Sequence, residues 1–141
     1  MINHLLLKKL ITTNIHKVYL KPGKEESLKR FHPWIFSGAI SRFDGEPEEG
    51  EVVEVYTSKK EFIAAGHFQI GSIAIRVLSF RQEPIDHDFW KRKLEIAYDM
   101  RRSIGIATNP TNNTYRLVHG EGDNLPGLVI DVYAKTAVMQ A

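Results

Sequence analysis

The chain has no cysteine, no long apolar run and little net charge, and these absences exclude whole classes of protein. Without cysteine, its 141 residues cannot form a disulfide, a thiolate metal site or a cysteine nucleophile. No segment approaches the roughly 20 apolar residues that span a bilayer. The N-terminal apolar run, Leu5 to Leu7, is followed at once by Lys8 and Lys9 and has no basic residue before it, so it lacks the layout of a signal peptide. We therefore expect a cytoplasmic protein that does not bind membranes.

The small net charge of +2 hides an uneven distribution. Residues 1–33 carry seven Lys and Arg against Glu25 and Glu26, whereas residues 34–57 carry a net charge of −5. Residues 58–82 are again basic, with a net charge of +3. Only local basic surface matters for binding a polyanion, so the basic segments are candidates for nucleic-acid contact. A solvated surface of mixed charge is the alternative.

Residues 17–82 predict a small, strongly bent β-sheet. Short β-rich runs lie at 17–20, 34–36, 51–57, 61–68 and 72–80, with a short helix expected in "KEESLKRF", residues 24–31. Pro33 makes a helical His32 unfavourable, so the chain should become extended there. "DGEPEEG", residues 44–50, is predicted to be an acidic loop. The alternating inward positions are predicted to be Val53, Val55, Ile63, Ile73, Ile75 and Val77. We expect a compact sheet or small barrel.

Residues 83–141 predict a helix followed by strands. Asp86 is a good N-cap for a helix over 88–104, and Gly105 ends it. Its apolar positions fall near helical spacing at Trp90, Leu94, Ala97, Tyr98, Met100 and Ile104, while its outer side should carry Lys91, Arg92, Arg101 and Arg102. Strands are expected at 115–118, 128–132 and from Thr136 onward. Because the last predicted strand runs to the end of the chain, we expect a fragment.

Two motifs in a fixed order carry a resemblance to a known family. "HPWIFSGAI", residues 32–40, is followed by "YRLVHGEGDNLPGLVIDVY", residues 115–133, with "IRVLSF" and "IDHDFW" between them. This order resembles bacterial S-adenosylmethionine-dependent methyltransferases of large-subunit ribosomal RNA that modify cytosine at carbon 5. The resemblance covers residues 17–141.

The resemblance implies a mixed α+β fold of three parts. Residues 1–16 would be a leader, residues 17–82 a PUA-like RNA-binding barrel, and residues 83–141 the α/β linking domain, truncated at its C-terminal end. The Rossmann-like domain that binds S-adenosylmethionine would lie outside this chain, because "GEGDNLPG" precedes a predicted strand and not a helix. The resemblance also implies cysteine chemistry, which this chain lacks. We expect a fragment that is inert alone and binds no cofactor.

The predicted partner is large-subunit ribosomal RNA. By resemblance, Lys29, Arg30 and His32 would contact phosphates, with Ser37 and the Gly38 backbone close behind. Trp34 can stack on a base or pack inward, and Phe36 is assigned to the core. Arg76 would extend the basic surface. An exposed, capped helix end is the alternative reading of the cations.

Two further hypotheses come from other residues. Glu121 and Asp123 would make a hydrolase only if they converged in a pocket, and turn chemistry is the simpler reading of their loop. His87 lies at a helix start, and the six histidines show no metal-ligand spacing. The chain can also be read as an interaction module that docks its own catalytic domain or a second copy.

Overall fold

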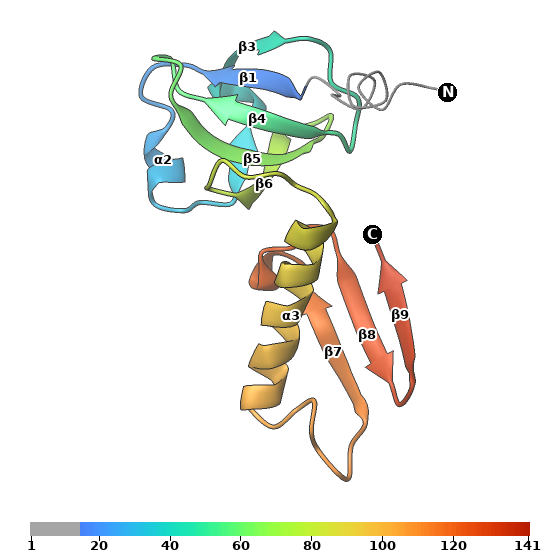
Figure 1. Cartoon of the computed structure of the whole chain (residues 1–141). Coiled ribbons are helices and arrows are strands. Elements are labelled where there is room, and N and C mark those ends of the chain that lie inside the picture. Colours follow the sequence, from blue (N-terminus) through green and yellow to red (C-terminus); the bar gives the residue numbers. More distant parts are fainter. Residues whose placement is uncertain (1–14) are drawn as a thin grey trace, which may run out of the picture.

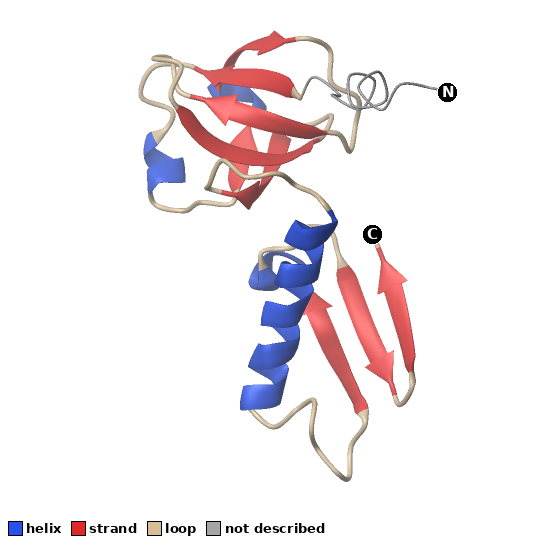
Figure 2. Cartoon of the chain, viewed as in Figure 1, coloured by secondary structure: helices blue, strands red, loops and turns tan. Residues whose placement is uncertain are grey.

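The structure is a computed structural model that describes residues 15–141, which form two sheet-containing units stacked end to end (Figure 1). The predicted leader, 1–16, lies outside the described residues except for its last two, and His16 already belongs to the first strand. The fold is mixed and rich in sheet, with one main helix (Figure 2). No helix in the described part is long and apolar enough to cross a membrane.

The first unit is a six-stranded sheet that curls on itself. Its strands are β1 (His16–Leu20), β2 (Trp34–Phe36), β3 (Ile40–Asp44), β4 (Val52–Tyr56), β5 (Phe62–Phe68) and β6 (Ile73–Ser79). They lie in the order β2-β6-β5-β4-β1-β3, with β1 parallel to β4 and the other neighbours antiparallel. The sheet keeps two edges, β2 and β3, so the strongly bent sheet or small barrel that was expected is a curled half-barrel.

Alternating apolar residues build the core of this unit. The predicted inward positions Val53, Val55, Ile75 and Val77 are buried, whereas Ile63 and Ile73 are half-buried. Gly66 allows the bend, because β5 is irregular there and an added Cβ would collide with the backbone of Arg76 and come within 2.9 Å of the Ile75 side chain. A side chain at this position would therefore force the two strands apart.

A short helix and one 3₁₀ turn lie beside the curled sheet. The helix α2 (Glu26–Lys29) is shorter than predicted and buries Leu28. The 3₁₀ turn η1 (Ser37–Ala39) connects β2 to β3, a strand that the sequence did not predict. β3 buries none of its residues fully and is an edge strand, so it lacks the apolar alternation by which the other strands were found.

The second unit contains one long helix against a three-stranded sheet. The helix α3 (His87–Ser103) begins at the predicted cap, where the Asp86 carboxylate accepts a hydrogen bond from the Phe89 amide at 3.0 Å. The strands β7 (Thr114–His119), β8 (Val129–Tyr133) and β9 (Thr136–Gln140) follow in antiparallel order, with the 3₁₀ turn η2 (Gly120–Asp123) after β7. These bounds confirm the predicted helix and strands to within a few residues.

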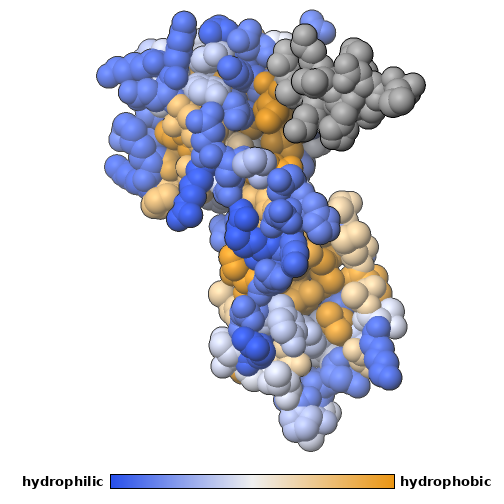
Figure 3. All heavy atoms as spheres, viewed as in Figure 1, coloured by the Kyte–Doolittle hydropathy of each residue, from blue (hydrophilic) through white to orange (hydrophobic). Residues whose placement is uncertain are grey.

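The helix buries a narrower face than its apolar pattern predicted. Ala97 is buried with Val118, Leu125 and Ile130, and Trp90 and Leu94 pack against this cluster. However, the predicted inward residues Tyr98, Met100 and Ile104 are exposed, because within residues 15–141 α3 packs mainly on β7. Figure 3 shows apolar atoms at the surface of this unit.

The two units are joined by polar and aromatic contacts as well as by the chain. An Arg76 guanidinium nitrogen from β6 lies 2.6 Å from a Glu121 carboxylate oxygen in η2. The His67 ring from β5 lies nearly parallel to the Trp90 ring from α3, with centroids 5.9 Å apart. These contacts tie the curled sheet to η2 and to the N-terminal end of α3.

Candidate nucleic-acid interface

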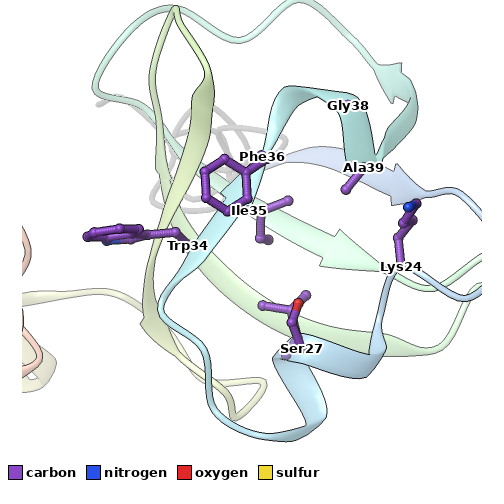
Figure 4. Close-up of a pocket in the computed structure, with 8 residues that line it drawn as sticks. Lys24, Ser27, Trp34, Ile35, Phe36, Gly38 and Ala39 are labelled. Carbon is purple, nitrogen blue, oxygen red and sulfur yellow. The ribbon is translucent and has the colours of Figure 1, made fainter.

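A pocket of about 370 Å³ lies where α2, β2 and η1 meet (Figure 4). It is lined by Lys24, Ser27, Leu28, Trp34, Ile35, Phe36, Gly38 and Ala39. The segment predicted to contact RNA therefore forms one wall of a real concavity. Its opposite wall comes from the turn before α2, which sequence reasoning did not include.

The chain reverses tightly between α2 and β2, and this reversal fixes His32. Phe31 adopts a positive φ of 61°, and the His32 amide donates to the Ser27 carbonyl at 3.1 Å. The Trp34 amide then donates to His32 Nδ1 at 3.2 Å. His32 Nδ1 also lies 3.1 Å from the Trp34 carbonyl oxygen, so the ring is held close to the Trp34 backbone.

The cations beside the pocket differ in how far their charges are compensated. Lys29 is paired with Glu26 at 2.7 Å on the same exposed helix, and this hydrogen bond raises the pKa of Lys29 and lowers that of Glu26. Lys21 donates to the Gly38 carbonyl at 2.8 Å, Lys24 lines the pocket, and Arg30 is exposed. Lys21 and Lys24 were missed, although they flank the Pro22-Gly23 turn.

The aromatic residues of β2 lie on the face opposite to the one assigned to the core. The prediction that Phe36 is a core residue is wrong, because its ring is 49% exposed whereas Ile35 is only 3% exposed. Alternation correctly placed Trp34 and Phe36 on one face. Pairing with β6 sets Ile35 opposite Ile75 in the core, so the aromatic pair is on the outer face.

Trp34 and Arg76 lie together at the contact between the units. The Trp34 ring points away from the pocket (Figure 4), and the Arg76 guanidinium lies 5.7 Å from its centroid. Arg76 also donates to Gln69 at 2.7 Å and to Glu121 at 2.6 Å. Its side chain does leave the core, as predicted, but its charge is compensated by a carboxylate of the second unit.

Each of the two acidic residues of η2 is held by a different arginine. Glu121 pairs with Arg76, whereas Asp123 pairs with Arg101 of α3 through both carboxylate oxygens and also accepts from the His119 amide. The Asp123 carboxylate is only 4% exposed. Burial alone would raise the pKa of Asp123, but the hydrogen bonds from Arg101 and His119 outweigh it and hold that pKa below its usual value. The loop is thus structural, which removes the basis for a hydrolase.

The placement of Arg101 corrects the predicted outer face of the helix. Its side chain is 12% exposed and donates to the Arg116 carbonyl as well as to Asp123. Lys91, Arg92 and Arg102 are exposed as predicted. His87 is 91% exposed, and within residues 15–141 no three His, Asp or Glu side chains are grouped as metal ligands would be.

The glycine-rich segment does not make a cofactor cradle. Gly120 to Gly127 run from β7 through η2 into β8, so no helix N-terminus follows the glycines to receive a phosphate or carboxylate. This segment therefore does not fit S-adenosylmethionine.

Comparison with known proteins identifies the first unit as a PUA-like domain, since residues 18–80 match the family model of that name. Over most of its length the chain is also homologous to the N-terminal part of ribosomal RNA large subunit methyltransferase I. It is 42% identical to the Vibrio cholerae protein over 124 residues and 43% identical to the Aliivibrio fischeri protein over 125. Each match covers 87% of this chain but 31% of the relative.

Solved structures share the arrangement of both units. A putative SAM-dependent methyltransferase from Streptococcus mutans matches 87% of this chain with a TM-score of 0.70 at 18% identity. A putative methyltransferase complexed with SAH matches with a TM-score of 0.71, also at 18% identity. This chain covers 32% and 31% of those proteins, respectively. At such identities the likeness establishes the fold, and the chain corresponds to about a third of each relative.

Proposed function

We propose that this chain is the RNA-binding front portion of an S-adenosylmethionine-dependent ribosomal RNA methyltransferase, of the type that modifies carbon 5 of cytosine. The observation that carries this proposal is identity above 40% with ribosomal RNA large subunit methyltransferase I over 87% of the chain. The pocket between α2, β2 and η1 supports the RNA-binding part, because it combines the exposed Lys24 with the exposed Phe36 side chain.

In this proposal the interface holds the RNA backbone and the base faces separately. The predicted contacts are Lys29, Arg30, His32, Trp34, Ser37, Gly38 and Arg76, to which the pocket adds Lys21, Lys24 and Phe36. Arg30 and Lys24 would face phosphates and Phe36 would stack on a base. Lys29 would leave its ion pair with Glu26 and bind a phosphate instead. Trp34 and Arg76 would act indirectly, by holding the second unit in place.

Methyl transfer is assigned to the rest of the protein. S-adenosylmethionine would supply the methyl group there, and residues 15–141 would contribute only binding and orientation of the RNA. The chain alone should therefore bind RNA without modifying it.

The test is a fluorescence titration of ribosomal RNA fragments across a salt series. We expect binding that falls steeply with salt, and the variants Lys24→Glu and Arg30→Glu should weaken it on all sequences alike. Each phosphate contact removed should reduce the salt slope by about 0.7 to 0.9. Lys59→Glu makes the same charge change at the tip of the turn between β4 and β5 and should have little effect. Absence of RNA binding at low salt would refute the proposal.

The exposed edge of β9 favours a second candidate function, protein contact. All five residues of β9 are exposed, including Val138 and Met139, at 47% and 68%. An open edge strand can pair with another chain. Its occupant would be the catalytic part of the same protein or a second copy. Sedimentation distinguishes these functions, because a tight dimer that is indifferent to RNA would favour the second.

A further inference from the structure

A second concavity, of about 480 Å³, lies between the two units. Its walls come from the turn after α2, the end of β6 and the first half of α3. In Figure 1 the turn after α2 lies at the end of the first unit that faces α3. We call this concavity, lined among others by Phe31, Phe80, Arg81, Arg92 and Lys93, the inter-unit cleft.

Phe31, which lines the cleft, has both an unfavourable backbone conformation and an exposed apolar side chain. Its φ of 61° lies in the left-handed region, which bulky residues avoid. Its ring is also 71% exposed, and it meets the Phe80 ring edge-on at 5.2 Å between centroids. Packing does not account for an aromatic residue here, because little of the ring is buried. A ring held in the open next to a second ring suits a ligand that stacks.

The walls of the cleft carry three cations and a single carboxylate. Glu83 is paired with Arg92 at 2.6 Å and also accepts from the Ser79 hydroxyl. Arg81 is exposed, and Lys93 is half-buried, so that burial lowers the pKa of Lys93. Within the described residues, the one hydrogen bond from the Lys93 ammonium goes to the Asn124 carbonyl at 3.5 Å. Excess positive charge beside stacking surfaces complements a polyanion with accessible bases.

We propose that the inter-unit cleft binds single-stranded RNA that continues from the pocket beside α2. One base would stack on Phe31 and the adjoining phosphates would face Arg81 and Lys93. Continuity supports this path, since Phe31 lies between Arg30 and His32 of the candidate interface. This inference rests on the proposed function and adds to it a contribution of the second unit to RNA recognition.

The test uses the full chain and two RNA ligands of about 12 nucleotides, one single-stranded and one duplex. Phe31→Gly removes the ring and relieves the backbone, so the variant should fold at least as stably as the unchanged protein. Its affinity for the single strand should fall about 5- to 150-fold, the loss that corresponds to one stacked base. Duplex affinity should not change, since paired bases cannot reach the ring. Phe31→Tyr keeps the ring and should bind both ligands normally, while Lys93→Gln should reduce the salt slope for the single strand by about 0.7.

The possible outcomes separate the two proposals. If the unchanged chain binds neither RNA, the proposed function fails, and this inference fails with it. If it binds RNA and Phe31→Gly binds the single strand normally, or loses both ligands equally, the cleft inference alone is overturned. If Phe31→Gly alters self-association in sedimentation while RNA binding is unchanged, the cleft is a protein contact and the inference is again overturned.

Discussion

Replacing Asp123 with asparagine should unfold the second unit more readily, because this carboxylate is the most deeply buried partner of any described ion pair. The pair joins η2 to α3, with 12% of the Arg101 side chain and 4% of the Asp123 side chain exposed. In Asp123→Asn the new amide keeps an oxygen for the His119 N–H, but its NH₂ group faces the guanidinium. Two donors then face each other, and a buried positive charge loses its counter-charge.

The size of the effect follows from what Arg101 retains. Removing one partner of a fully buried pair costs roughly 3–5 kcal/mol. Arg101 still donates to the Arg116 carbonyl at 3.1 Å and to the Ala97 carbonyl at 3.4 Å, so part of the loss is compensated. We therefore expect the free energy of unfolding to fall by about 2–3 kcal/mol.

The assay is urea unfolding followed by Trp90 fluorescence in a Trp34→Phe background, which leaves one tryptophan, in the second unit. Asp131→Asn is the matched control, because it makes the same change in the more exposed pair with Arg116 and should cost much less. Equal losses for the two variants would refute the reasoning.

The effect should also depend on pH. The pKa of Asp123 is lowered in the folded state, so its contribution to the free energy of unfolding is present above the unfolded pKa of about 4 and is lost as pH falls through the folded value. The gap between Asp123→Asn and the unchanged protein should therefore close in acid.

Three more predictions concern the first unit. Gly66→Ala should destabilise this unit by about 1–3 kcal/mol in thermal unfolding, because β5 and β6 leave no room for a Cβ. Gly38→Ala is the control and should not destabilise it, because a Cβ at Gly38 meets nothing within 4 Å. Equal melting temperatures for the two variants would contradict this prediction. Ile35→Ala should lower the free energy of unfolding by about 2–5 kcal/mol, and Phe36→Ala should lower it far less. If urea unfolding gave the reverse order, Phe36 would be the core residue. Burial, followed by a hydrogen bond to Glu54, raises the pKa of Tyr56 to about 12, so phenolate absorbance should show one tyrosine titrating late; no such tyrosine would disprove it.

Local sequence signals were sufficient to predict the helix and strands of the second unit, because recognisable residues cap its elements. Asp86 and Gly105 bound the helix as expected, and Gly105 has the positive φ of 76° that ends such helices. The sequence did not predict that the Arg101 side chain is only 12% exposed, since its partner Asp123 lies 22 residues away. Spacing along a helix assigns residues to faces, and the rest of the fold decides which faces are covered.

The first unit shows the same distinction for strands. Period-two alternation separated Ile35 from Trp34 and Phe36 but could not say which side would meet the core, since both sides are apolar. β3 was missed because it is defined by its pairing with β1, whose partners lie 20 to 27 residues away in the sequence. At the candidate interface, composition located the cations. It could not show that Lys29 forms an ion pair with Glu26, or that Lys24 lines the pocket from the turn before α2.

The place of β1 within its sheet limits how far the chain can be shortened. β1 is bonded to β3 on one side and to β4 on the other, through partners that begin at His16 and Val53. A version trimmed to residues 18–80, the span of the family match, would lose His16 and Lys17 and with them half of the register with β4. Shortening from the N-terminus would thus weaken an interior strand and loosen the edge strand β3 that pairs with it, whereas the edges at β2 and β3 are where extra sequence could be tolerated.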